Sequence, residues 1–376
     1  MNIIIVGGGT AGWITSLFLL SEYKDVNISV IESDTIGILG AGEGSTPLMR
    51  KFLKKCNIDE NDFIKKTKST FKLGIDFENW NIHNTSYKHP FINNAKAYHF
   101  DARLIAEYFK EISINRGVTH INGIVKSFVQ NDKKDITNLV LSDDTTIPTD
   151  FVFDCSGLHR LLIGKLYNSN WVSYSNHLKV NTAVPFFLNR DDTNMELDTK
   201  AIAMDYGWMW MIPLQHRWGC GYVFDGNMID EKQAKVEVEI KLNRKIESPK
   251  TLKFSAGYYD NVWVNNCIAI INYRFYKLQQ CETSTGTAVY IKFKASTGTS
   301  KIKAKADNNK IPGLFCRHNY LSTNYIHFRQ FVQTSNLVEA KFFVLLFLRR
   351  SSSFCRDLLS QPNSNSSHTS ATTLYS

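Results

Sequence analysis

The chain has 376 residues, a hydrophobic fraction of 43% and a formal net charge of +9, enough for one large domain or two of ordinary size. Its seven cysteines are odd in number and form no Cys-x-x-Cys pair, which argues against a disulfide framework and a structural zinc site, so no metal is expected. No basic segment followed by an apolar run opens the chain, and no run approaches the ~20 apolar residues of a membrane span; we expect a cytoplasmic protein without membrane contact.

The positive charge is concentrated toward the C-terminus. Residues 273–376 hold 14 of the 44 lysines and arginines but four of the 35 acids, so the rest of the chain is close to neutral. Such an asymmetry is typical of a basic arm that contacts nucleic acid. Here the basic residues are not interleaved with aromatic side chains on a recognisable binding module, so we expect no nucleic-acid partner.

The N-terminal segment has the pattern of a dinucleotide-binding unit. An apolar run at residues 2–6 predicts a buried strand, a glycine-rich turn and a helical pattern follow, and residues 27–31 predict a second strand. Glycines let the backbone approach a pyrophosphate, and Glu32, 20 positions after Gly12, would accept hydrogen bonds from ribose hydroxyls. A glycine-rich loop of another α/β protein is the alternative, and this motif does not separate NAD from FAD. The predicted cofactor contacts here are Gly7, Gly9, Thr10, Ala11, Gly12 and Glu32.

Two later segments favour FAD. A second glycine-rich loop, residues 42–47, runs into a helix that we expect to begin near Pro47, a favoured first-turn residue. A strand ending in Asp154-x-x-Gly157 is typical of the second flavin contact in many FAD-dependent monooxygenase-like proteins. These segments add Gly42, Glu43, Gly44, Ser45, Asp154 and Gly157 to the predicted cofactor contacts.

Residues 180–270 read as a half-buried sheet with many aromatic side chains. Its centre is Gly207-Trp208-Met209-Trp210-Met211-Ile212-Pro213, and a helix is expected from about residue 230 to 246. Because side chains alternate along a strand, Trp208 and Trp210 share one face, and taken alone they would be interpreted as core residues.

In this order and spacing, the motifs resemble the flavin-dependent tryptophan halogenases over about residues 1–270. The resemblance implies an α/β fold: an FAD-binding, Rossmann-like (flavin monooxygenase-like) part at 1–165 with an inserted β-rich substrate part at 166–270. The matching segments are Gly7 to Gly12, Gly42 to Pro47, Thr70-Phe71-Lys72 with Phe77-x-Asn79-Trp80, Tyr98 to Asp101, Asp154 to Gly157, Gly207 to Pro213, Trp263 and Asn266 to Ala269.

The resemblance also implies a chemistry. A separate flavin reductase would deliver reduced FAD, which with oxygen and halide gives hypohalous acid for attack on a small electron-rich aromatic such as tryptophan. Lys72 matches the lysine at the end of the passage to the substrate, where a partly desolvated ammonium can donate to hypohalous acid or become a haloamine. The alternative interpretation is that Lys72 is a solvent-exposed surface charge. Its position between Phe71 and Leu73 instead favours a lysine that lines a cleft.

The family's tryptophan motif implies a barrier between cofactor and substrate. Trp208, Trp210 and Pro213 would separate the aromatic substrate from the flavin, so that halide is oxidised instead. His99 and Asp101 also match family positions, but we expect them to pack and hydrogen-bond rather than to catalyse.

The resemblance ends after Ile270. The family continues with a Gly-Phe-x-Glu-Pro-Leu-Glu-type stretch that supplies a third flavin contact, the halide site and a glutamate partner for the lysine. Residues 277–281 can be encoded so that a one-base shift reads Glu-Ala-Thr-Thr-Met. We therefore hypothesise that the basic tail, 271–376, is frameshifted or disordered. The alternative is that residues 282–284 are a diverged remnant of the glutamate loop. Without a C-terminal closing unit the flavin part would keep an open sheet edge, so weak flavin binding and little halogenation are expected.

Two alternatives to a halogenase stay open. One is another FAD-dependent monooxygenase or oxidoreductase on the same scaffold, and the other is a non-functional product. The sequence makes no prediction of the aromatic substrate, the preferred halide or the oligomeric state.

Overall fold

The computed structural model describes residues 1–38, 43–81, 85–190, 196–248 and 250–270, all of which belong to one compact unit. The predictions for residues 271–376, including the frameshift and the missing closing unit, lie outside the described residues, as does the contact predicted at Gly42. None of the helices in the described ranges has the length and apolar character needed to cross a membrane.

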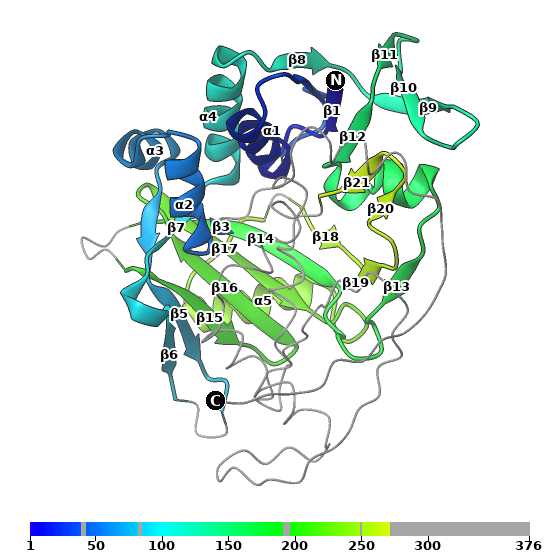
Figure 1. The fold of residues 1–376 in the computed structure, drawn as a ribbon. Coiled ribbons are helices and arrows are strands. Elements are labelled where there is room, and N and C mark those ends of the chain that lie inside the picture. Colours follow the sequence, from blue (N-terminus) through cyan, green and yellow to red (C-terminus); the bar gives the residue numbers. More distant parts are fainter. Residues whose placement is uncertain (39–42, 82–84, 191–195, 249, 271–376) are drawn as a thin grey trace, which may run out of the picture. The chain divides into compact units, whose positions relative to one another are not determined.

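A six-stranded sheet contains the predicted N-terminal strands (Figure 1). Five of its strands are parallel and β20 pairs antiparallel at one edge. The four apolar side chains of Ile3 to Val6 are buried, as expected of a parallel strand covered on both faces. Both predicted strands are confirmed, and the second extends to Glu32. In spatial order the sheet is β20 (Trp263–Val264), β21 (Cys267–Ala269), β12 (Phe151–Asp154), β1 (Asn2–Val6), β2 (Asn27–Glu32) and β8 (Thr119–Asn122).

Two long helices pack side by side near this sheet, α1 (Thr10–Glu22) and α4 (Ala102–Asn115). Their buried hydroxyls, Ser16 Oγ and Ser113 Oγ, lie 2.9 Å apart, and Trp13 is fully buried on α1. The side chain of Asp101 caps α4 by accepting from two of its backbone amides. Two shorter helices are α2 (Leu48–Lys55), which begins directly after Pro47 as expected, and α3 (Glu60–Thr67).

A seven-stranded sheet carries the tryptophan motif. It is antiparallel except for the parallel pair β5–β15. Helix α5 (Glu231–Leu242) packs against β14 and β17. It begins with a capping box, and its last residue, Leu242, is four residues before the expected end; left-handed Asn243 caps it. In spatial order the strands are β18 (Leu252–Lys253), β14 (Thr182–Asn189), β17 (Arg217–Phe224), β16 (Gly207–Pro213), β15 (Asp198–Ala203), β5 (Gly74–Glu78) and β6 (Tyr87–Pro90).

Three smaller sheets complete the strands. The one that matters for the site is β3 (Glu43–Gly44), β7 (Ala97–Phe100) and β4 (Thr70–Lys72), with β7 in the middle. The others are β11 (Thr146–Pro148), β10 (Ile136–Leu141) and β9 (Val125–Gln130), and the pair β13 (Trp171–Ser173) and β19 (Gly257–Tyr259). Short helical turns are η1 (Ile92–Asn94), η2 (Gly157–His159) and η3 (Leu161–Leu166).

The two large sheets are interleaved along the chain. Strands β5 and β6 lie before residue 165 yet pair into the seven-stranded sheet, while β20 and β21 lie after it and pair into the parallel sheet. The boundary expected at 165/166 therefore does not divide one sheet from the other, because each takes strands from both sides. The division into functional domains stays a prediction.

Candidate active site

The turn after β1 is built by close backbone contacts that require glycine. Gly7 has φ +117°, and a Cβ there would lie 2.4 Å from the carbonyl oxygen of Cys155. A Cβ on Gly12 would lie 1.9 Å from the carbonyl oxygen of Gly7. A Cβ on Gly9, by contrast, would meet nothing within 4 Å. Gly7 and Gly12 thus serve the packing of strand on helix, and Gly9 leaves open space at the start of the helix.

The N-terminus of α1 begins at this open space. Gly9 is its N-cap residue, no side chain caps the helix, and its first turn contains no acid. Thr10 and Ala11 are the first residues of the helix. An uncapped N-terminus presents backbone amides and the positive end of the helix dipole, which suits a phosphate group. The predicted contacts Gly9 to Gly12 are therefore brought together around one helix end.

Glu32 ends β2 beside the glycine turn. A Cβ on Gly8 would lie 1.4 Å from a carboxylate oxygen of Glu32, so the carboxylate packs directly on the backbone of the turn. Its other oxygen accepts from Lys110 Nζ at 2.5 Å and lies 3.0 Å from Nε2 of His120. The acid is thus held in place by two basic side chains that the sequence motif did not indicate.

Asp154 ends β12, and its carboxylate is hydrogen-bonded within the protein. One oxygen accepts from the amide and hydroxyl of Ser156 at 3.1 and 2.6 Å. The other accepts from the amides of Leu162 and Ile163 at 2.8 and 2.9 Å. These four bonds fix the turn in which Gly157 has φ +60° and anchor η3. At this motif the carboxylate shapes the backbone, and the predicted flavin contact stays a prediction.

Lys72 lies on one face of the small sheet β3–β7–β4. Cross-strand partners share a face, and the register pairs Thr70 with His99, Lys72 with Ala97 and Gly44 with His99. Lys72 is 9% exposed and His99 is fully buried. The predicted lysine is therefore in a buried polar setting and not in open solvent.

Space for the Lys72 ammonium is provided by Gly44. A Cβ there would lie 2.7 Å from Lys72 Nζ, so any larger residue would displace the ammonium. On its other side, Nζ lies 5.8 Å from the ring centroid of Phe91, within range of a cation–π contact. Glu43, one residue before Gly44, is 1% exposed and belongs to the opposite face of β3. Ser45 follows, accepting from the amide of Tyr98 through its hydroxyl at 2.9 Å.

Trp208 and Trp210 lie on one face of β16, as their spacing predicted. Both are 3% exposed, their ring centroids are 6.1 Å apart, and they pack in a cluster with Phe77 and Trp80. A Cβ on Gly221 would lie 2.1 Å from the Trp210 ring, so this neighbouring glycine makes room for it. The indole nitrogen of Trp80 donates to the carbonyl oxygen of Ala201 at 2.8 Å. Aromatic and aliphatic side chains together thus fill this face of the sheet.

The end of the tryptophan strand is tied to the lysine strand. The hydroxyl of Thr70 donates to the carbonyl oxygen of Pro213 at 2.6 Å and lies 3.2 Å from Nδ1 of His99. The hydrogen bonding expected of His99 is confirmed. Sequence reasoning missed Thr70 and Thr199 as its partners; the period of two that places Thr70 and Lys72 on one face was the available signal.

Asp101 is structural, as expected. Besides capping α4, its carboxylate forms an ion pair with Arg217 at the start of β17. Burial is the largest single effect and acts to raise the pKa of Asp101, but the charge and hydrogen bond of Arg217 and the two capped amides of α4 together hold the pKa below its usual range. The pair joins α4 to the seven-stranded sheet. No local sequence pattern indicated Arg217.

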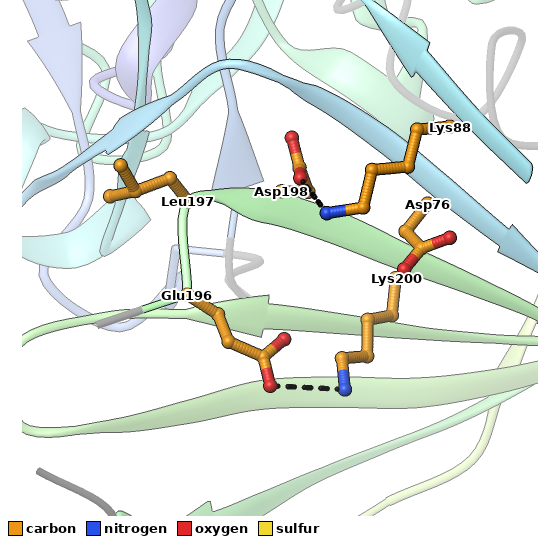
Figure 2. Close-up of a pocket in the computed structure, with 6 residues that line it drawn as sticks. All are labelled: Asp76, Lys88, Glu196, Leu197, Asp198 and Lys200. Carbon is orange, nitrogen blue, oxygen red and sulfur yellow. Dashed lines mark hydrogen bonds and ion pairs between the residues drawn. The ribbon is translucent and has the colours of Figure 1, made fainter. Parts of the chain in front are cut away.

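A cavity of about 250 Å³ lies at the β5–β6 side of the seven-stranded sheet (Figure 2). Asp76 lines it and alternates with Ile75 and Phe77, whose side chains pack with the tryptophans, so the cavity is on the other face of β5. Lys88 donates to Asp198 at 2.9 Å, and Lys200 lies 3.1 Å from Glu196. Because it lies on the face of β5 that does not pack with the tryptophans, the cavity is separate from the predicted site.

Known proteins match this chain over the described region. A model of the tryptophan halogenase family matches residues 2–96 and 92–272. The tryptophan 6-halogenase of Streptomyces albogriseolus is 25% identical over 341 residues, which cover 72% of this chain and 64% of that protein. The tryptophan 7-halogenase of Lentzea aerocolonigenes is 26% identical, with the same coverage of both chains. The solved structure of a flavin-dependent halogenase from Xanthomonas campestris superposes with a TM-score of 0.68 at 30% identity, over 71% of this chain and 64% of that one.

These matches have a common limit. The chain spans 64% of the length of both curated relatives and of the Xanthomonas structure, slightly less than two thirds. The family model stops at residue 272, two residues after the point at which the sequence motifs end. The family match therefore covers all the strands in the described part of the chain and stops close to where that part ends.

Proposed function

The chain belongs to the tryptophan halogenase family, and from this membership we propose that it binds FAD and halogenates a small electron-rich aromatic, with tryptophan as the first substrate to test. A separate flavin reductase would supply the reduced cofactor, and a halide ion would be the co-substrate. The observation that carries this proposal is the buried lysine, Lys72, placed opposite Gly44 and joined through Thr70 to the end of the tryptophan strand.

The residues at the start of α1 fit a dinucleotide. The open space at Gly9 and the uncapped helix N-terminus suit its pyrophosphate, while Glu32, held by Lys110 and His120, presents a carboxylate for ribose hydroxyls. The turn at Gly157 would face the other half of the cofactor. When bound, reduced FAD supplies the electrons that let oxygen and halide form an oxidised halogen species.

Lys72 would receive that oxidised halogen on the substrate side. Its ammonium can donate a hydrogen bond to hypohalous acid, or as an amine can carry the halogen covalently. The low exposure of the side chain excludes most competing water. The facing ring of Phe91 gives one apolar wall beside the ammonium.

Trp208 and Trp210 would keep the organic substrate away from the flavin. Their packed rings, together with Phe77 and Trp80, would form an apolar barrier. A small oxidant would cross this barrier more easily than an aromatic substrate. This selectivity would separate a halogenase from a monooxygenase, in which the substrate itself meets the oxidised flavin. Pro213 ends the same strand and holds it to Thr70.

Replacement of Lys72 tests the proposal. The full chain is incubated with FAD, a flavin reductase, NADH, bromide or chloride, and tryptophan or indole, and products are identified by mass spectrometry. The sequence predicts little halogenation by this chain, and the halogenated product that the wild type does give should fall by about 10²- to 10⁴-fold in Lys72→Met, the range for removing a positioned proton donor. Flavin binding, measured by fluorescence titration, should be unchanged.

Lys96→Met is the matched control, because the Lys96 ammonium lies 5.0 Å from the ring centroid of Phe71, beside the same strand. This variant should halogenate like the wild type. Oxygenated product without dependence on halide would instead favour a monooxygenase, and bound flavin with no product of either kind would contradict the proposed activity. Nucleotide sequencing across codons 265–285 would then decide whether one inserted or deleted base separates this chain from the halide-binding stretch of its family.

A further inference from the structure

His99 is a fully buried histidine whose two ring nitrogens both contact threonine hydroxyls. Nδ1 lies 3.2 Å from Thr70 Oγ1 on β4, and Nε2 lies 2.9 Å from Thr199 Oγ1 on β15. The hydroxyl of Thr70 also donates to the carbonyl oxygen of Pro213 at 2.6 Å. One imidazole therefore joins the small sheet to two neighbouring strands of the large one.

The direction of each hydrogen bond follows from counting protons. A carbonyl oxygen only accepts, so the single hydroxyl proton of Thr70 is committed to Pro213. Thr70 must then accept from His99, which places a proton on Nδ1. A neutral imidazole carries one ring proton, so Nε2 accepts from the hydroxyl of Thr199.

The surroundings of His99 favour the neutral ring. Burial acts first and the positive charge of Lys72 second, and together they hold the pKa of His99 well below its usual range, against a smaller opposite effect from the Phe71 backbone. Thr199, which β15 brings to the ring, carries no charge. A protonated imidazole would place a second positive charge next to Lys72 in this buried setting, which desolvation and charge repulsion both disfavour.

We propose that His99 is a positioning residue: a neutral imidazole fixed as the Nδ1–H tautomer, which holds the strand of Lys72 against the Pro213 end of the tryptophan strand. The chain of bonds runs from Pro213 through Thr70 and His99 to Thr199. It ties β4 to β16 and β7 to β15, and so fixes where the Lys72 ammonium lies relative to Trp208 and Trp210. The effect on catalysis rests on the proposed function. The tautomer of His99 and the low accessibility of the Lys72 ammonium to reagents do not.

The tautomer is tested directly by NMR. The full chain is labelled with ¹⁵N-histidine, and two-bond ¹H–¹⁵N correlations are recorded between about pH 5.5 and 8.5, the range in which an ordinary histidine titrates. Of the ten histidines, the one whose signals vanish in His99→Gln should show the Nδ1–H pattern at every pH. An Nε2–H pattern, or titration near the ordinary value, would overturn the proposal. If His99→Gln does not fold, Thr199→Val identifies the signal by the shift of its Nε2 resonance.

The positioning role is tested without any enzymatic turnover. Lysines are reductively methylated with formaldehyde and a borohydride, and the modification of Lys72 is followed by peptide mass spectrometry. Thr70→Val removes the bonds to both Pro213 and His99, so Lys72 should be methylated about tenfold faster than in the wild type as local opening becomes easier. Thr67→Val is the matched control: Thr67 is also a buried threonine that donates to a backbone carbonyl, that of Phe63, outside this chain of bonds.

Each outcome is informative. Faster methylation in Thr70→Val but not in Thr67→Val supports the positioning role, whether or not the wild type halogenates tryptophan. Equal methylation rates in the wild type and Thr70→Val would overturn it. Where halogenation is measurable, Thr70→Val should lower kcat with little change in KM for the aromatic substrate, because the flavin and substrate surfaces remain intact.

Discussion

The cofactor end of the parallel sheet and the lysine face of the small sheet use polar side chains in different ways. At the cofactor end, both oxygens of Asp154 are taken up by neighbouring amides and a hydroxyl, and Glu32 is held by Lys110 and His120. What faces outward there is largely backbone, at Gly9 and at the start of α1. On the lysine face, Thr70 and His99 are also taken up by hydrogen bonds within the protein, and the side chain proposed to meet a reactant is that of Lys72.

This difference follows from the ligands each region would handle. A pyrophosphate is bound well by backbone amides and a helix dipole, which need glycine and a fixed turn more than particular side chains. An oxidised halogen must be received by one group with a transferable proton, so there a side chain is indispensable. Substitutions should therefore act on folding and cofactor affinity in the first region and on turnover in the second.

Alanine substitutions in the glycine turn give the largest expected effect and separate packing from binding. Gly12→Ala forces a Cβ against the carbonyl oxygen of Gly7, and should lower the free energy of unfolding by about 3 kcal/mol, the upper range for overpacking. Gly9→Ala points its Cβ into open space and should cost no more than about 1 kcal/mol, because alanine is a poorer N-cap residue than glycine. If that space holds the pyrophosphate, Gly9→Ala should still weaken FAD binding by at least about tenfold.

Urea unfolding and flavin fluorescence titration measure the two effects. Equal FAD affinity in Gly9→Ala and the wild type would show that the open space at the helix start does not receive the cofactor. Equal stability of Gly12→Ala and the wild type would show that the turn relaxes more easily than its backbone contacts indicate. Either result would weaken the contrast between the two regions.

Gly44→Ala tests the lysine face by moving a side chain instead of removing it. The new Cβ would meet the Lys72 ammonium, the flexible end of its side chain, so the fold should tolerate the change while the ammonium shifts. A displacement of this size costs up to about 10²-fold in turnover, and we expect a loss of about 10- to 100-fold in kcat. Flavin affinity, measured in parallel, should change by less than about threefold. A parallel loss of flavin affinity would instead identify Gly44 as a cofactor contact, as the sequence alone suggested.

The local parts of the fold were predictable from sequence, and the contacts between distant segments were not. The glycine turn with its flanking strands, and the shared face of Trp208 and Trp210, follow from short periodic patterns. The small sheet does not, because β3, β4 and β7 are two to four residues long and pair across other elements. The room that Gly44 leaves for Lys72 depends on that pairing, so the sequence indicated the lysine but not what surrounds it.

The interleaving of the two large sheets could also not be predicted from the sequence. Strand β5 pairs with β15, more than 120 residues later, and nothing in the pattern of Gly74–Glu78 selects that partner. Glu32 illustrates the same limit on a smaller scale, since Lys110 comes from the middle of α4 and His120 from β8. The local strand–turn–helix pattern thus predicts where Glu32 lies, whereas the packing of distant elements decides which side chains contact it.

The smallest expected effect concerns the pH dependence of stability and comes from His99. In the unfolded chain its pKa is about 6.5, while in the native state burial and then the charge of Lys72 hold the pKa well below that value. Below about pH 6.5 the unfolded chain therefore binds a proton that the native state does not, and stability falls as pH decreases, by at most about 1.4 kcal/mol per pH unit for one proton. His99→Gln lacks both the pH-dependent term and the hydrogen bonds of the imidazole. At about pH 7.5, where the wild-type ring is neutral in both states, the loss of the hydrogen bonds should make this variant less stable than the wild type. The difference in urea midpoints should narrow toward about pH 5.5, since the carboxylates that titrate at lower pH are common to both proteins. A difference that stays constant over this range would mean that the native imidazole accepts a proton as readily as the unfolded one, so that the buried site tolerates a second positive charge beside Lys72.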